Sequence, residues 1–251
     1  SKTNPAKGVP NQQTIKSVRN RLPADDELRQ LWHAIDAAPR LSNAVALVIK
    51  LTIITGLRRK EVAGARIDEF DGDIWTIRGD IAKAGRIVDE GRMKSGREQV
   101  VYLSRQARAL FDEALAECAD DEYIFPADPL DTAKRSTELP YINSDSVTRA
   151  MRRICDDAGI EDLHLHDMRT AMVSFLDEAE IQESIQSALL HHTPQDVTSV
   201  HYRRSKREDR LRAAWQLWAD HVEKVVSAPA TEHQSPKSAD LATDAWPDQL
   251  A

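Results

Sequence analysis

The feature that most constrains the fold is the segment 41–55 (LSNAVALVIKLTIIT), which is apolar almost all the way round a helix. A helix without a polar face has no side to present to water, so it must lie inside the protein. Gly56 follows directly, and glycine often ends a helix because it adopts the left-handed backbone conformation at no steric cost. We therefore expect a buried helix that ends at Gly56.

Most of the remaining chain shows the spacing of amphipathic helices. After Pro23, apolar residues recur at positions 28, 31, 32 and 35, and three acidic residues stand near the helix start, where they interact favourably with its dipole. Further helices are expected at about 58–65, from Ser104 through Leu115, at about 145–158, at 166–179, 181–190 and 195–202, and at about 208–226.

The pattern changes between residues 67 and 103. The runs 74–77 (IWTI) and 100–103 (VVYL) are typical of strands, and Asp71-Gly72 and Ser95-Gly96 are typical of turns. A small antiparallel sheet is the simplest interpretation. The predicted fold class is therefore mainly α with a small antiparallel β-sheet (α+β), and residues 122–143 are expected to be mostly loop.

Composition leaves a nucleic-acid ligand open. The 251 residues suffice for one large domain, and no apolar run approaches the ~20 residues of a transmembrane helix, so no membrane partner is expected. The net charge is −7, but residues 203–212 hold six bases against two acids, and the local field matters most for a phosphate ligand. Cys118 and Cys155 lack metal-ligand spacing and are expected to be buried free thiols of a cytoplasmic protein.

The strongest chemical signal lies in residues 163–202. His166 and Arg169 are three residues apart at a predicted helix start, and Tyr202 follows His192 by ten residues. This combination is interpreted as a phosphate clamp with a phenolic nucleophile beside it. Each element also has an ordinary interpretation, because His–Arg pairs are common on solvated helices and an amphipathic tyrosine is common in cores.

Two earlier segments would bring further cations. TGLRRKEV (55–62) places Arg58 after a glycine turn at a helix start, where free N–H groups favour anions, and Glu61 faces the same side. Lys94 lies at the turn before the second strand. Taken alone, Arg58 and Glu61 would be a surface pair and Lys94 a solvated charge. The ordered set of residues is more informative than any one of them.

The order Arg, Lys, His-x-x-Arg, His, Tyr resembles the catalytic domain of the tyrosine recombinase (phage integrase) family, and the resemblance extends from Asn4 to about Val225. TGLRRKEV resembles the first arginine box, and residues 92–107 (RMKSGREQVVYLSRQA) resemble the lysine hairpin with its following helix. HDMR and LLHHTPQDVTSVHYRR resemble the remaining two boxes. The closing box and the later AWQLWADHVEK are most similar to integrases of satellite phages and genomic islands.

The resemblance implies the tyrosine recombinase catalytic-domain fold over residues 21–226. Residues 1–20, which contain NPAKGV, are expected to be the linker from an N-terminal core-binding domain that is absent from this chain. Residues 227–251 are expected to be a disordered acidic tail.

The resemblance also implies a DNA strand transferase that needs no metal and no cofactor. Tyr202 would attack the phosphorus and form a 3′-phosphotyrosyl bond, with Arg58 and Arg169 as clamps. His192 would donate a hydrogen bond to the phosphate, His166 would accept or relay the tyrosine proton, and Lys94 would protonate the leaving 5′-oxygen. Glu61 would orient Arg58. Seven basic residues are candidate DNA-backbone contacts: Arg149, Arg152, Arg153, Arg203, Arg204, Lys206 and Arg207.

Several positions depart from the family pattern. His191 replaces a usual glycine, which loses easy access to left-handed backbone angles, and it is expected to support His192 or lie at the surface. The long segment 79–91 supplies a rival lysine, Lys83, although Lys94 fits the following strand better. Four further residues are interpreted as structural variation, packing or surface residues: Tyr102 for a usual proline, Glu180 for a usual glycine, His164 and His201.

The implied function is site-specific recombination that integrates or excises a phage or genomic island. The partners would be double-stranded DNA attachment sites, three further protomers in a tetramer on DNA, and an excisionase or host DNA-bending factor, at the bacterial nucleoid. The isolated domain is expected to be monomeric. The alternatives are a type IB topoisomerase-like enzyme, a non-catalytic DNA-binding relative that has lost a pocket residue, and a helical scaffold with a buried Tyr202.

Overall fold

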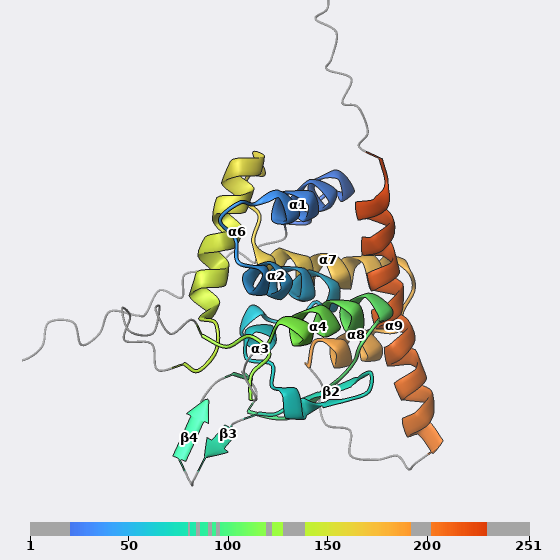
Figure 1. Cartoon of the computed structure of the whole chain (residues 1–251). Coiled ribbons are helices and arrows are strands. Elements are labelled where there is room, and N and C mark those ends of the chain that lie inside the picture. The colour runs from blue at the N-terminus through green and yellow to red at the C-terminus, as the bar shows by residue number, and fades with distance from the viewer. Residues whose placement is uncertain are drawn as a thin grey trace, which may run out of the picture.

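The computed structural model describes residues 21–79, 81–83, 86–89, 92–93, 96–118, 122–127, 139–191 and 202–229, and of residues 81–89 and 202–204 it describes the backbone alone. The predicted linker (1–20) and most of the predicted tail lie outside these residues. The described part is mainly helical with small antiparallel sheets, which confirms the predicted fold class (Figure 1). Within it, no helix has the length and apolar character needed to cross a membrane.

Helix α2 (Asn43–Thr55) lies at the centre of the fold, as its apolar sequence predicts. It packs against six other helices, namely α1 (Asp25–Ala37), α3 (Arg59–Ala63), α4 (Arg105–Glu117), α6 (Ser144–Ala158), α7 (Leu165–Glu178) and α9 (Tyr202–Ser227). All residues from Leu51 to Leu57 are buried. Gly56 ends the helix with φ of 65°, the left-handed conformation expected of it.

The last turn of α2 is completed by hydrogen bonds from other parts of the chain. The final carbonyls of a helix have no partner within the helix and need one elsewhere. The Gly56 amide donates to Thr52 O at 3.1 Å. The indole nitrogens of Trp218 and Trp215, both on α9, donate to Ile53 O at 2.9 Å and Thr55 O at 3.2 Å. These hydrogen bonds therefore fix the position of the end of α2, from which the turn to Arg58 begins.

The predicted sheet is present and has three strands in the order β1-β2-β5. Strand β2 (Ile74–Ile77) pairs antiparallel with both β1 (Phe70–Asp71) and β5 (Gln99–Tyr102), so that Trp75 stands opposite Val101. A short 3₁₀ helix, η1 (Ile67–Glu69), precedes β1. A separate hairpin of β3 (Ile81–Lys83) and β4 (Arg86–Asp89) was not predicted, since these strands are too short to show a clear alternation.

The segment that carries the β3-β4 hairpin has its two ends, Gly79 and Gly96, in contact with each other. A Cβ atom added to Gly79 would lie only 2.4 Å from Gly96 O, so the two backbones touch where the segment leaves β2 and returns towards β5. Gly96 itself has φ of 63°, which is consistent with the predicted Ser95-Gly96 turn. Only glycine permits such close backbone approach at Gly79.

The helix predictions are confirmed except at the C-terminal end. Helices α1, α2, α3, α4, α6, α7 and α8 (Glu183–Leu189) match the predicted ranges to within a few residues, and the helix predicted at 195–202 falls largely outside the described residues. The last helix was predicted to begin near 208 but begins at Tyr202. Its basic first turns carry no apolar stripe, yet arginine, lysine and glutamate are good helix formers, and Arg212 pairs with Glu208 at 3.0 Å.

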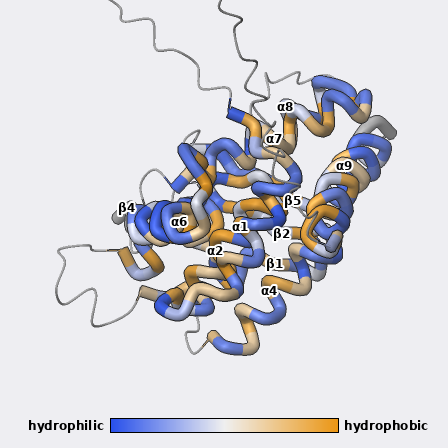
Figure 2. Tube along the Cα trace, turned by 90° about the horizontal axis from the view of Figure 1, so that it is seen from above, coloured by the Kyte–Doolittle hydropathy of each residue, from blue (hydrophilic) through white to orange (hydrophobic). Residues whose placement is uncertain are grey.

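Helix α9 is buried on one face. Trp215, Trp218, Val222 and Val225 are buried, as the sequence pattern predicted, and Figure 2 shows hydrophobic and hydrophilic positions alternating along the helix. The prediction for the cysteines holds for Cys155 but not for Cys118. Cys118 is only half-buried because it follows the last residue of α4, where its thiol donates to Tyr123 O at 3.1 Å.

Candidate functional site

Arg169 joins two segments that are far apart in the sequence. It lies in the second turn of α7 and is 5% exposed. Its Nη1 donates to Gly56 O at 2.8 Å, in the turn after α2, and its Nη2 donates to Leu190 O at 2.5 Å, at the end of α8. The arginine therefore connects α7 both to the turn that precedes Arg58 and to the turn at His191.

Arg58 is held by the predicted partner, Glu61. Arg58 precedes α3, and Glu61 Oε1 accepts from Arg58 Nη1 at 2.7 Å while Oε2 accepts from the Arg58 backbone amide at 2.8 Å. The Glu61 side chain is fully buried, whereas 29% of the Arg58 side chain is exposed. Because α3 is little more than one turn long, its dipole adds little. The guanidinium itself is the group available to an anion.

The two arginines act on each other electrostatically. Burial, followed by the positive charge of Arg58, lowers the pKa of Arg169 to about 10, and the Glu61 carboxylate opposes that shift. Two guanidinium groups with one carboxylate leave a net positive charge in a largely desolvated place. A bound anion would favour the charged form of both arginines.

His166 lies beside this pair on the first turn of α7. Desolvation, and then the charges of Arg169, Arg58 and Arg59, lower its pKa below the ordinary value, while Asp167 opposes the shift. The imidazole is therefore neutral near pH 7 and has one nitrogen that can accept a proton. Its neighbour His164 is exposed and precedes the helix, as predicted for a surface residue.

His191 adopts the left-handed conformation that glycine would provide. Its φ is 52°, and its backbone amide donates to Ala188 O at 3.0 Å. The same applies to Glu180, where φ is 57°, so both substitutions for glycine keep the turn. Desolvation lowers the pKa of His191, as do the charges of Arg58, Arg97 and Arg169, against that of Glu61. The charges of Arg58 and Arg169 thus lower the pKa of both His191 and His166.

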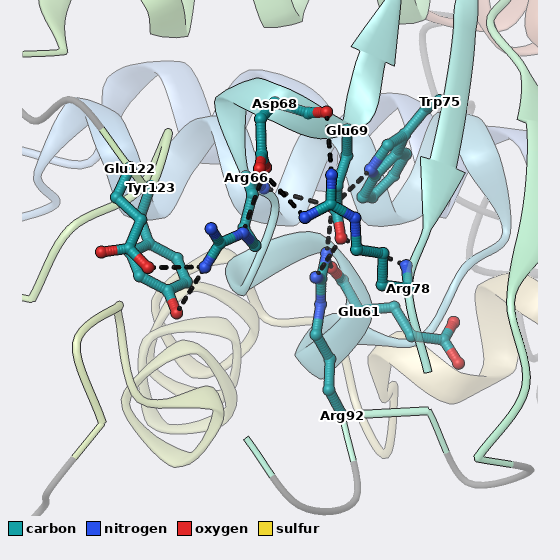
Figure 3. A network of polar contacts seen from close by, with 9 residues as sticks. All are labelled: Glu61, Arg66, Asp68, Glu69, Trp75, Arg78, Arg92, Glu122 and Tyr123. Carbon is teal, nitrogen blue, oxygen red and sulfur yellow. Dashed lines mark hydrogen bonds and ion pairs between the residues drawn. The ribbon is translucent and has the colours of Figure 1, made fainter. Parts of the chain in front are cut away.

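A buried ion pair near this site was not predicted from the sequence. Arg92 and Glu69 are both fully buried and form two hydrogen bonds, of 2.7 and 2.8 Å (Figure 3). Arg92 stands two residues before Lys94 in the RMK motif. Charge alone predicts exposure for both residues, and the only signal that could have identified Arg92 is its position two residues before Lys94.

The structure brings together only some of the predicted residues. Lys94 and His192 lie outside the described residues, as does the side chain of Tyr202, the first residue of α9. Lys83, Arg203 and Arg204 are described by their backbone alone, and His201 is not described. Lys206 and Arg207 are exposed on α9. Within the described part of the chain, no three His, Cys, Asp or Glu side chains come together as a metal site requires.

The three arginines predicted to contact DNA from α6 have different surroundings. Arg152 lines a cavity of about 540 Å³ that also contains Arg59, His164 and His166. Arg153 lines a different cavity, of about 430 Å³, with Arg40. Arg149 is exposed and donates to Ser146 Oγ at 2.9 Å. Of the three, Arg152 is the one that lines the cavity containing His166.

The residues that meet at this site lie in a part of the chain that is similar to a known protein family. The sequence model of the phage integrase family matches residues 21–209, which include Arg58, His166, Arg169 and Tyr202. The chain belongs to the phage integrase family. The match covers every described residue of the cluster.

Two curated integrases are similar to this family member. The integrase of Enterobacteria phage P4 is 31% identical over 183 residues, which are 70% of this chain and 40% of the relative. Prophage integrase IntA of Escherichia coli (strain K12) is 27% identical over 216 residues, 85% of this chain and 46% of the relative. The chain spans less than half the length of both.

Solved structures of the family share the fold. The integrase from mycobacterium phage Brujita matches with a TM-score of 0.51 and 16% identity, over 85% of this chain and 65% of that chain. A lambda integrase dimer bound to a COC′ core site matches with a TM-score of 0.50 and 16% identity, over 73% and 62% of the two chains. At this identity the likeness establishes the fold and no more.

Proposed function

We propose that this chain is the catalytic domain of a site-specific recombinase that cleaves and rejoins DNA strands through a 3′-phosphotyrosyl intermediate. The observation that carries the proposal is the convergence of Arg58, Arg169 and His166 from two elements of a phage integrase family member. Two arginines, of which Arg58 alone is paired with a carboxylate in the described part of the chain, form a suitable site for a phosphodiester. A neutral imidazole beside them is suited to accept a proton.

The reaction is a transesterification at one DNA phosphate. The Tyr202 hydroxyl attacks phosphorus and loses its proton to His166, so that an O–P bond forms while the bond from phosphorus to the 5′-oxygen breaks. Lys94 donates a proton to that leaving oxygen, which departs as a 5′-hydroxyl. Attack by a 5′-hydroxyl of another strand reverses the step and frees Tyr202. No metal and no nucleotide cofactor is required.

The clamps act on charge that develops in the transition state. Arg58, oriented by Glu61, and Arg169 bind the non-bridging oxygens, and His192 donates a further hydrogen bond, with His191 beside it. Stabilising that charge is most of the catalytic work in phosphoryl transfer. Arg152 on α6 and the basic residues at the start of α9 bind the DNA backbone and set its position without reading the sequence.

The assembly extends beyond this chain. We propose that residues 21–226 are the catalytic domain, that residues 1–20 link it to an N-terminal core-binding domain, and that residues 227–251 are an acidic tail. Four protomers act on two double-stranded attachment sites of a phage or genomic island, with an excisionase or a host DNA-bending factor. The site of action is the bacterial nucleoid in the cytoplasm.

The nucleophile is tested by covalent trapping. DNA that carries the ends of the encoding element is incubated with the protein and run on a denaturing gel. Tyr202→Phe should abolish the covalent adduct and leave DNA binding unchanged, since only the hydroxyl is removed. An adduct that persists in this variant contradicts the proposal, and absence of any adduct with the unmodified protein supports the non-catalytic alternative.

The general acid is tested with a modified substrate. Lys94→Ala should lose cleavage of an ordinary phosphodiester and regain it on a 5′-bridging phosphorothiolate, because a thiolate leaves without a proton. Lys83→Ala is the control and should leave both substrates unaffected. Products separate recombination from a topoisomerase-like activity, since strand exchange between two sites differs from relaxed circles.

A further inference from the structure

The Glu69 carboxylate lies at the centre of the buried network in Figure 3 and has a full set of donors. Arg92 Nη1 and Nη2 donate to its two oxygens at 2.7 and 2.8 Å. The Trp75 indole donates at 3.0 Å, and the backbone amides of Arg78 and Arg66 donate at 3.1 and 3.2 Å. Glu69 therefore ties Arg92 to both ends of the β1-β2 hairpin.

Arg92 also contacts the segment that carries the phosphate clamp. Its Nη2 donates to Glu61 O at 3.3 Å, and the Glu61 side chain in turn holds Arg58. The end of α3 fits closely against the same side chain, because a Cβ atom on Gly64 would lie 3.0 Å from Arg92 Nε. One guanidinium therefore spans Glu69 and the backbone of the Arg58–Glu61 turn.

Stability alone does not account for this pair. Desolvation of two charges offsets most of their attraction, and apolar residues of similar size often replace a buried ion pair without loss. Within the described part of the chain Arg92 Nε has no hydrogen-bond partner, which adds to the cost of burial. Directional hydrogen bonds nevertheless fix a position that apolar contacts leave adjustable.

The position fixed here is that of residues 92 and 93. Met93 is 1% exposed, so it is buried like the Arg92 side chain, which contacts Glu61 O. Lys94 is the next residue in the sequence. An error of about 1 Å in the placement of a reacting group can lower a rate by roughly 10²-fold.

We propose that Arg92 and Glu69 are positioning residues for strand transfer, which fix the start of the lysine-bearing segment against the Arg58–Glu61 turn. The inference rests on the proposed function, because Lys94 acts as a general acid only in that reaction. Neither residue contacts the DNA. They act through the backbone that precedes Lys94.

The test compares two substrates in one preparation of the full chain. Arg92→Lys keeps the charge but cannot bridge both Glu69 oxygens and Glu61 O with one planar fork. Single-turnover adduct formation on an ordinary phosphodiester should fall on the order of 10²-fold. On a 5′-bridging phosphorothiolate it should fall less than about threefold, since no general acid is needed there. The ratio of the two rates does not depend on the fraction of protein that is folded.

Arg78→Lys is the matched control, because Arg78 belongs to the same network but pairs with Asp68 at the surface. It should leave both rates unchanged. If Arg92→Lys does not fold, Glu69→Gln, which keeps one acceptor, takes its place in the same comparison. Equal loss on both substrates assigns the pair a purely structural role, and no loss on either overturns the proposal. If the unmodified chain forms no Tyr202-dependent adduct, the proposed function fails instead.

Discussion

One carboxylate holds Arg58 at two points. Glu61 Oε1 lies 2.7 Å from Arg58 Nη1, and Glu61 Oε2 lies 2.8 Å from the backbone nitrogen of the same residue. The side chain and the backbone of the arginine are thus fixed together. A similar arrangement occurs at α1, where Glu27 accepts from the Ala24 amide at 2.9 Å and from Arg21 at 2.6 Å, away from the site.

These two glutamates give a matched pair of variants. Glu61→Ala and Glu27→Ala should each lower the free energy of unfolding, by about 1–3 kcal/mol for the buried Glu61 and less for Glu27. Only Glu61→Ala should slow adduct formation, by roughly 10–10²-fold, because Arg58 loses its orientation. Urea unfolding and single-turnover cleavage measure the two effects. Equal slowing by both variants would assign the effect to stability.

Gly56 is required for two separate reasons. Its φ is 65°, and an added Cβ would lie 2.3 Å from the sulfur of the buried Met172. Gly72 has φ of 59° and nothing within 4 Å, so Gly72→Ala should cost only the left-handed strain of about 1–2 kcal/mol. Gly56→Ala should cost about 1–3 kcal/mol more, because Met172 must move within a packed core. Similar losses in thermal unfolding would show that Met172 adapts without cost.

His191 holds a backbone conformation that strains any residue with a side chain. His191→Gly should raise the free energy of unfolding by about 1 kcal/mol, and Glu180→Gly should do the same. His191→Ala keeps the strain and should not stabilise the protein. If the imidazole has no direct contact with the phosphate, His191→Gly should also retain cleavage. Loss of the adduct in both His191 variants would assign the phosphate contact to His191.

His166 determines the expected pH dependence. Because its pKa in the folded protein is lowered, His166 is neutral above its ordinary value of about 6.5 and becomes protonated only further into the acid range. Its contribution to stability is complete above the unfolded pKa and is lost as the pH falls through the folded pKa. Adduct formation should therefore fall on the acid side at a pH below about 6.5.

NMR titration of the His166 imidazole checks this without an activity assay. Arg59→Ala removes one of the charges that lower the pKa of His166, so it should move the titration and the acid limb of the rate upward together. An acid limb that stays in place while the titration moves would exclude His166 as the proton acceptor.

Two neighbouring arginines on α6 should differ in DNA binding. Arg152 shares a cavity with His166, whereas Arg153 lies in another cavity with Arg40. Arg152→Ala should weaken binding and reduce the slope of log K against log salt by about 1, while Arg153→Ala should leave both unchanged. Fluorescence anisotropy over a range of salt concentrations measures both. The opposite order would place the DNA on the other side of α6.

The sequence predicted those features that depend on local patterns. The apolar run 41–55 predicted a buried helix, and the spacing of Arg58 and Glu61 predicted their contact, because i,i+3 side chains meet on a helix. The turn at His191 was in doubt from the sequence, since a non-glycine residue pays for φ above zero. The structure keeps that turn with φ of 52°.

Features that depend on distant contacts were not predicted. Arg169 donates to Gly56 O and Leu190 O. Every residue has a backbone carbonyl, so the sequence does not indicate which two carbonyls accept these hydrogen bonds. Glu69 and Arg92 were missed because burial of a charged pair depends on a partner 23 residues away. The start of α9 at Tyr202 was missed because its stabilising contacts are ionic and carry no apolar period.

The indoles of Trp215 and Trp218 have a consequence for where this folding unit ends. The family match stops at residue 209, yet these two side chains complete the last turn of α2, directly before Gly56 and Arg58. A fragment that ends at residue 209 keeps every proposed catalytic residue. It loses the two indoles that donate to the last carbonyls of α2. The boundary of the cooperative unit is therefore set by the far end of α9 and not by the last residue that takes part in the chemistry.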